Sequence, residues 1–266
     1  MKTRNQWILG AAIGFVFAAA PVFAGAPFGG DDAGCAPDDK LGATCGKIVA
    51  VGLGKLNANV IKCHLVQAGH AFQTGHSSPG FDNAEENCSV GNPTNSAKAK
   101  FDAYMVKAAA YCAPAVVTSA NARRDTLLAD QTNPDSLDAL NGSFYCDTTS
   151  GLMISEPGGD EAGFIPASAD NNKCSVTVAK AYRKLVYSVY KCHVQLGLAA
   201  FAGKPFDEEL CEETAPKGAL ARYNAYVQKA ILAGICPPCL VANATALGAN
   251  AVAAIDAQNA EIYPCP

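Results

Sequence analysis

The sequence has few of the residues on which catalytic and nucleic-acid-binding sites are built. It contains only 4 histidines, and its 20 Lys and Arg residues are scattered along the chain rather than clustered. A chain without a basic stripe is poorly suited to follow a phosphate backbone, so we expect no nucleic-acid partner. Nucleophile-elbow, phosphate-loop and zinc-protease motifs are also missing. These absences favour a non-catalytic protein over an enzyme.

Long uncharged apolar runs are missing after the first 24 residues. At the start, Lys2 and Arg4 precede an apolar stretch over residues 7–20, and Ala24 ends a small-residue cleavage site. This pattern predicts a secretory signal peptide over residues 1–24. Its apolar run is shorter than the roughly 20 residues that a membrane-spanning helix needs. We therefore expect a secreted or periplasmic protein that does not span a membrane after the signal is removed.

Cysteine is abundant, and the chain contains one unit twice. Residues 29–34 (GGDDAG) recur as residues 158–163 (GGDEAG), a shift of 129 residues, and residues 62–64 (KCH) recur at the same shift as residues 191–193. Because thiols oxidise outside the cytosol, we expect all 12 cysteines to form disulfides. The repeat predicts that the two copies fold alike and carry matching bridges.

Apolar residues recur at helical spacing in both copies. From Cys45 to Cys63, and again from Cys174 to Cys192, they step by three and four residues along one stripe. No segment alternates as a strand would. We predict an all-α fold of two tandem disulfide-stapled three-helix units, the first in residues 25–157 with a connector and the second in residues 158–266.

Turn and capping residues predict where these helices begin and end. The first helix of each copy is expected to end near Gly69 or Gly197, because glycine readily adopts the left-handed conformation of a helix end. The second helix of the first copy should begin after Ser96, whose hydroxyl can cap it. A third helix should start near Val116 or Leu240.

Helix geometry predicts four of the bridges. Eighteen residues along one helix span about 27 Å, so the cysteines of one stripe cannot bond each other. If the second helix runs antiparallel to the first, its C-terminal end lies beside the start of the first helix. The connecting loop then lies beside the end of the first helix. The expected pairs are Cys45–Cys112, Cys63–Cys88, Cys174–Cys236 and Cys192–Cys211.

Four cysteines are left over by this argument. One arrangement joins Cys35 to Cys146 and Cys239 to Cys265, and the other joins Cys35 to Cys239 and clamps the two copies together. The first is favoured because it keeps the bridges local.

The cysteine pattern resembles that of a group of uncharacterised exported bacterial proteins with duplicated cysteine-rich helical repeats. The resemblance rests on C-x17-C-H, a following F-D-x-x-x-C and a G-G-D-x-A-G-F-I-P segment between the copies, and it covers most of residues 29–266. The first copy departs from it, with Cys112-Ala-Pro-Ala115 against Cys236-Pro-Pro-Cys239. The resemblance implies export and a helical fold, and it implies no activity.

Two cysteine motifs have functional alternatives. Cys236 and Cys239 form the C-x-x-C of thiol-disulfide oxidoreductases, but no strand precedes them, and the first copy keeps only Cys112. Cys63-His64 and Cys192-His193 are half of a C-x-x-C-H haem site, for which Met105 or Met153 would be a second axial ligand. We expect no cofactor, because Cys63 and Cys192 lie at positions where disulfides are predicted.

The weak metal candidates are His64, His193, Asp31 and Asp160. The histidines are expected to bond the last carbonyls of a helix, and the glycine-flanked acidic loops are expected to keep their carboxylates in water. The leading hypothesis is therefore an exported structural or binding protein that presents its surface to a macromolecule or an envelope component. Thiol-disulfide redox chemistry and haem or metal binding are the alternatives.

Overall fold

The computed structural model describes residues 25–214 and 216–265, so the predicted signal peptide at 1–24 lies outside the described residues. The elements within them are β1 (Pro27–Gly29), β2 (Asp32–Cys35), α1 (Lys40–Thr74), α2 (Pro79–Glu86), the π-helical turn η1 (Asn87–Gly91), α3 (Ala97–Ala108), α4 (Pro114–Leu127), α5 (Leu137–Phe144), the 3-10 turn η2 (Thr148–Ser150), α6 (Ala169–Phe201), α7 (Glu208–Glu212), α8 (Ala219–Leu232) and α9 (Pro238–Ile262). The predicted all-α class is confirmed. The short hairpin of β1 and β2 was not expected.

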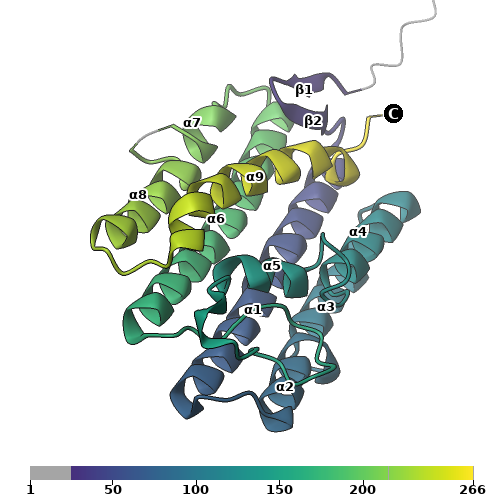
Figure 1. Cartoon of the computed structure of the whole chain (residues 1–266). Helices are drawn as coiled ribbons and strands as arrows, with labels where there is room; N and C mark the ends of the chain where they lie inside the picture. The colour runs from purple at the N-terminus through teal and green to yellow at the C-terminus, as the bar shows by residue number, and fades with distance from the viewer. Residues whose placement is uncertain (1–24, 215, 266) are drawn as a thin grey trace, which may run out of the picture.

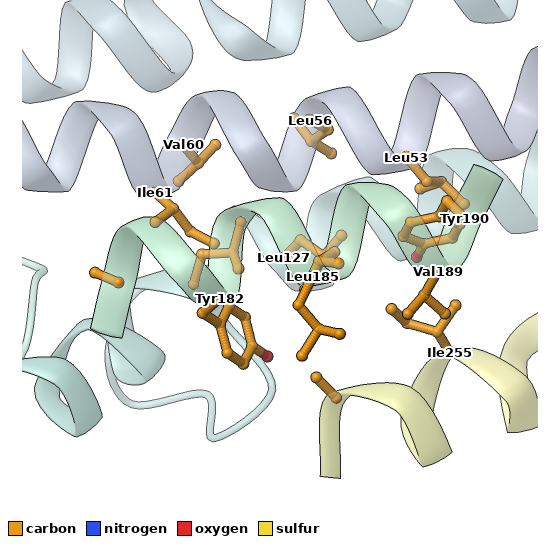
Figure 2. Close-up of a cluster of buried hydrophobic side chains, with 14 of the residues drawn as sticks. Leu53, Leu56, Val60, Ile61, Leu127, Tyr182, Leu185, Val189, Tyr190 and Ile255 are labelled. Atoms are coloured by element: carbon orange, nitrogen blue, oxygen red, sulfur yellow. The ribbon is translucent and has the colours of Figure 1, made fainter. Parts of the chain in front are cut away.

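The two long helices α1 and α6 form the middle of the molecule (Figure 1). They run antiparallel, with Leu53 beside Tyr190 and Ile61 nearer to Tyr182 (Figure 2). Helices α3 and α4 pack against α1, and helices α8 and α9 pack against α6. The buried apolar side chains of both copies form one continuous cluster. The repeat units therefore share a single core, built mainly from the apolar stripes of their first helices.

Helix boundaries follow the capping residues, with two corrections. Ser96 accepts a hydrogen bond from the Ala99 amide at the start of α3, as predicted. The predicted end of α1 at Gly69 is wrong, because the helix continues to Gly75, whose φ of 76° makes it the left-handed cap. The predicted end at Gly197 is wrong as well, since α6 continues to Phe201 and Gly203 has the positive φ.

The third helix differs between the copies. In the second copy it is the continuous α9, whereas in the first copy it is divided into α4 and α5. Pro134 lies between these two helices. A proline inside a helix removes a backbone hydrogen bond and clashes with the preceding turn, so Pro134 disfavours an unbroken helix through this segment.

All four bridges predicted from helix geometry are confirmed: Cys45–Cys112, Cys63–Cys88, Cys174–Cys236 and Cys192–Cys211. Both arrangements considered for the other cysteines are wrong. The structure joins Cys35 to Cys265 and Cys146 to Cys239. Each of these bridges links one copy to the other, because β2 packs against α9 and α4 and α5 contact α9. Six disulfides indicate an oxidising environment outside the cytosol.

Among the described residues, α9 is long and apolar enough to cross a membrane by length and composition alone. The expectation that no stretch after residue 24 passes this test is therefore wrong. The same criterion is met by core helices, and α9 buries Leu240 and Val252 on the face that packs against α6 and α8. Asp256 is also buried on this helix.

Candidate functional site

The sequence-predicted residue His193 lies at the centre of four carboxylates from three other elements. Its Nε2 atom is 3.1 Å from Asp256 Oδ1 of α9, 3.2 Å from Asp32 Oδ1 of β2 and 3.2 Å from Glu212 Oε1 of α7. The Oε1 atom of Glu208, at the start of α7, is 3.9 Å away. We call these five residues the His193 cluster.

The His193 cluster is shielded from water. The side chains of His193 and Glu212 are 0% and 1% exposed, and that of Glu208 is 10% exposed. Both oxygens of Glu212, and the Oδ1 and Oε1 atoms of Asp32 and Glu208, have no hydrogen-bond partner. No Lys or Arg among the described residues forms an ion pair with these carboxylates. Among the described residues, the imidazole is therefore the one basic group that contacts them.

Burial makes the charged forms of these carboxylates unfavourable. It raises the pKa of Asp32 to about 6, with a smaller opposing effect from His193. Burial and the neighbouring Glu212 raise the pKa of Glu208 to about 10. Burial also raises the pKa of Glu212 to about 9, and Asp256 and Asp32 add to the effect. Without a cation, the cluster holds protons that exposed carboxylates would release at neutral pH.

Two exposed carboxylates border the His193 cluster. Ligand oxygens of Asp31 and Glu209 lie within 4.8 Å of one another and of Glu208. Glu208 thus belongs both to the buried cluster and to this acidic rim. A cation arriving from solvent would meet negative charge at the rim before it reached the imidazole.

A second cluster surrounds His64 in the first copy. The Nε2 atom of His64 is 3.1 Å from Asp138 Oδ1 of α5 and 3.4 Å from Glu85 Oε1 of α2. Glu161, from the connector before α6, is close enough to Glu85 to raise the pKa of that carboxyl. These four residues form the His64 cluster. Glu161 is 0% exposed, and its Oε1 atom has no hydrogen-bond partner.

Neutral donors satisfy part of the His64 cluster. Ser89 donates to Glu85 Oε1, and Ser155 donates to Glu161 Oε2. Burial raises the pKa of Glu85, Glu161 and Asp138, and these hydrogen bonds oppose the increase at both glutamates. The first copy therefore contains a buried carboxylate cluster like that of the second, with fewer charges and more hydroxyl groups.

The repeat places equivalent residues in both clusters. Glu85 and Glu208 each lie three residues before a bridged cysteine of the matched pair Cys88 and Cys211. At a shift of 118 residues, Asp138-Ala-x-Asn141 in the first copy becomes Asp256-Ala-x-Asn259 in the second. Sequence reasoning missed these four carboxylates, although the repeated D-A-x-N pattern was a usable signal.

The two copies exchange their glycine-rich loops. Asp32, from the loop of the first copy, enters the cluster of the second copy, while Glu161, from the loop of the second copy, enters the cluster of the first. Backbone hydrogen bonds also cross between the copies. Cys35 N donates to Tyr263 O at 2.9 Å, and Phe164 N donates to Tyr145 O at 2.8 Å. Each cluster is therefore assembled from both repeats.

Several expectations about candidate residues need correction. The acidic loops do not keep all their carboxylates in water, because the side chain of Asp32 is 5% exposed and Glu161 is buried. His64 and His193 do not bond the last carbonyls of a helix, because each lies well before its helix ends and faces carboxylates. Asp31 is exposed at the rim, and Asp160 interacts with Glu86 beside the His64 cluster.

The cysteines of the alternative motifs all lie in disulfides. Cys236 and Cys239 bond to Cys174 and Cys146 rather than to each other. Cys63 and Cys192 bond to Cys88 of η1 and Cys211 of α7 and are not free to form a thioether. Comparison with protein families, curated proteins and solved structures found no match to this chain.

Proposed function

We propose that this is an exported binding protein whose ligand is a divalent metal ion, held by the His193 cluster. The proposal replaces the expectation of no metal site and specifies the binding role that the sequence left open. It rests on one observation: three carboxylate oxygens converge within 3.2 Å of a single ring nitrogen, His193 Nε2.

Hydrogen bonds from the imidazole alone do not account for this arrangement. One ring nitrogen carries at most one hydrogen, so it cannot satisfy three acceptors at once. Buried carboxylates without partners are costly, and four of them share one buried imidazole. A cation among the five side chains would accept electron pairs from the neutral imidazole and from the carboxylates together. It would remove the unsatisfied acceptors and much of the mutual repulsion.

The donor set favours a first-row transition metal. Carboxylate oxygens alone suit Ca²⁺ or Mg²⁺, while an imidazole nitrogen suits Zn²⁺, Fe²⁺ and similar ions. His193 contributes the nitrogen, and the absence of a thiolate ligand separates the cluster from structural zinc sites. We therefore assign the ligand to the Mn²⁺, Fe²⁺ and Zn²⁺ class.

Secretion or periplasmic export is part of the proposal. The signal-peptide pattern of residues 1–24 and the six disulfides both support it. In such a compartment a cation site that lacks thiolates cannot be lost by oxidation of its ligands. The carboxylate and imidazole donors fit that requirement.

Isothermal titration of the oxidised, chelator-treated protein with Zn²⁺ and with Mn²⁺ tests the proposal. We expect binding in the micromolar range or tighter, with Ca²⁺ much weaker. His193→Ala should weaken the tightest site at least about 100-fold, because it removes the only nitrogen ligand. His76→Ala is the matched control, since His76 is exposed and outside both clusters. Equal titrations of His193→Ala and the unmodified protein would contradict the proposal.

A further inference from the structure

We propose that the His64 cluster is a second site for the same class of divalent cation, and that it binds the ion more weakly than the His193 cluster does. This inference extends the proposed function from one site to two. It depends on residues of the first copy and on Glu161 from the second, none of which belongs to the His193 cluster.

The His64 cluster contains buried atoms without hydrogen-bond partners. His64 is 2% exposed, and its Nε2 atom has no hydrogen-bond partner of acceptable geometry, although Asp138 and Glu85 face it. Glu161 is fully buried, and its Oε1 atom is also without a partner. The His64 nitrogen thus faces carboxylates of α2 and α5, and Glu161 lies beside the α2 carboxylate of Glu85. Such convergence suits a metal ion better than it suits a hydrogen-bond network.

The internal repeat supplies an independent argument. His64, Glu85 and Asp138 match His193, Glu208 and Asp256 by their positions in the repeat. Glu161 matches Asp32 at the shift of 129 residues, and each enters the cluster of the opposite copy. The duplicated unit therefore carries its nitrogen and three carboxylates into both clusters.

One position accounts for unequal affinity. Glu212 follows the bridged Cys211, whereas its counterpart after Cys88 is Ser89. The His193 cluster therefore has four carboxylates and the His64 cluster has three. Ser89 also donates a hydrogen bond to Glu85, which satisfies an oxygen that is unpaired in the second copy. Fewer charges and prior hydrogen bonds both reduce the gain from binding a cation.

The chain thus has two cation sites of different affinity. The stronger one should fill first, and the weaker one should fill as the free cation concentration rises. Because ligands of each site come from both copies, each bound ion would hold the two repeats together. The protein would then take up two ions per chain, and the first would be retained at concentrations at which the second is released.

Titration with Zn²⁺ alone tests the inference. The unmodified chain should bind two ions, with the second at least about tenfold weaker than the first. Glu161→Gln, which keeps the shape of the side chain, should abolish the weaker site and leave the stronger one within about twofold. Ser89→Glu should strengthen the weaker site by about tenfold, and Glu212→Ser should weaken the stronger site by a similar factor.

The outcomes separate the two proposals. A single ion per chain, lost in His193→Ala and unaffected by Glu161→Gln, would overturn the inference and leave the His193 site intact. Loss of one ion in Glu161→Gln, with no effect of His193→Ala, would overturn the proposed function and retain a site at His64. Circular dichroism of each variant in its oxidised form establishes that the helical fold is unchanged. If Glu161→Gln misfolds, Ser89→Glu becomes the test. An unchanged Zn²⁺ affinity of the weaker site in Ser89→Glu would overturn the inference.

Discussion

Asp32 Oδ1 lies 3.2 Å from His193 Nε2, although the two residues come from opposite copies of the repeat. A two-stranded hairpin before the first helix carries Asp32 across to the end of α9. The cluster around His193 is therefore incomplete in an isolated second copy. Cation binding and the docking of the two repeats should depend on each other.

Asp32→Asn should weaken the stronger cation site by about tenfold or more, because an amide oxygen is a neutral and poorer ligand than a carboxylate. Asp31→Asn is the matched control, since Asp31 belongs only to the exposed rim. Its effect should be within about threefold and should disappear at high salt. Titration with Zn²⁺ at two salt concentrations measures both. Equal losses in the two variants would contradict the placement of Asp32 as a ligand.

Removing the bridge between Cys35 and Cys265 should affect the cation site as well as stability. Cys35 ends the strand that holds Asp32, and Cys265 follows the helix that holds Asp256. The double variant Cys35→Ser, Cys265→Ser should lose about 3 kcal/mol or more of unfolding free energy and should bind Zn²⁺ less tightly. Urea unfolding and titration give the two values.

The bridge between Cys146 and Cys239 provides the control, because both of its residues lie outside the His193 cluster. Its double Cys→Ser variant should be destabilised while the affinity of the stronger site changes by less than about threefold. Peptide mapping without reduction should recover both inter-copy bridges. A Cys236–Cys239 peptide would contradict the fold and revive the redox alternative.

The stability of the cation-free protein should fall as pH rises. Glu208 and Glu212 have folded-state pKa values of about 10 and about 9, well above the ordinary 4.5. Protonated Glu208 and Glu212 therefore favour the folded state at pH below their ordinary pKa. This contribution to stability is lost as the pH rises toward their folded-state pKa values. The melting temperature in chelator should drop by about 5 °C or more between pH 5 and pH 8.

One addition and one variant check the cause of that slope. Saturating Zn²⁺ should raise the melting temperature most at pH 8, because the ion replaces protons on the same carboxylates. Glu212→Gln should flatten the slope in chelator, since the amide does not titrate. A melting temperature that rises from pH 5 to pH 8 in chelator would show that these carboxylates are not buried as described.

Two glycines of α1 should respond in opposite directions to alanine. A Cβ at Gly46 would lie 2.0 Å from the Tyr263 ring, so Gly46→Ala should destabilise the fold by about 1–3 kcal/mol. A Cβ at Gly69 would meet nothing within 4 Å, so Gly69→Ala should stabilise the helix by up to about 1 kcal/mol. Chemical denaturation measures the difference. Equal effects would contradict the packing of Tyr263 against α1.

Local patterns in the sequence predict much of the fold. The apolar stripes of α1 and α6 and the bridges such as Cys45–Cys112 follow from helix geometry within one copy. The inter-copy bridges do not, because they depend on how the repeats pack together. Gly69 failed as a helix end because the following residues continue the buried stripe through Ala71.

The candidate site was less predictable, because its ligands are far apart in the sequence. His64 and His193 stand out beside their cysteines, but their carboxylate partners lie on other helices and on the loop of the opposite copy. The prediction that the glycine-rich loops keep their carboxylates in water was wrong, because burial of the Asp32 side chain depends on tertiary packing. Aligning the third helices of the two copies would have exposed the matched Asp138 and Asp256.

Anomalous diffraction from crystals of the oxidised protein grown with Zn²⁺ tests the central claim most directly. Data collected above and below the zinc absorption edge locate the ion without reference to the ligands. We expect a peak among His193, Asp256 and Asp32, about 2.0–2.1 Å from His193 Nε2. Zinc peaks confined to surface residues, with none beside His193, would contradict it.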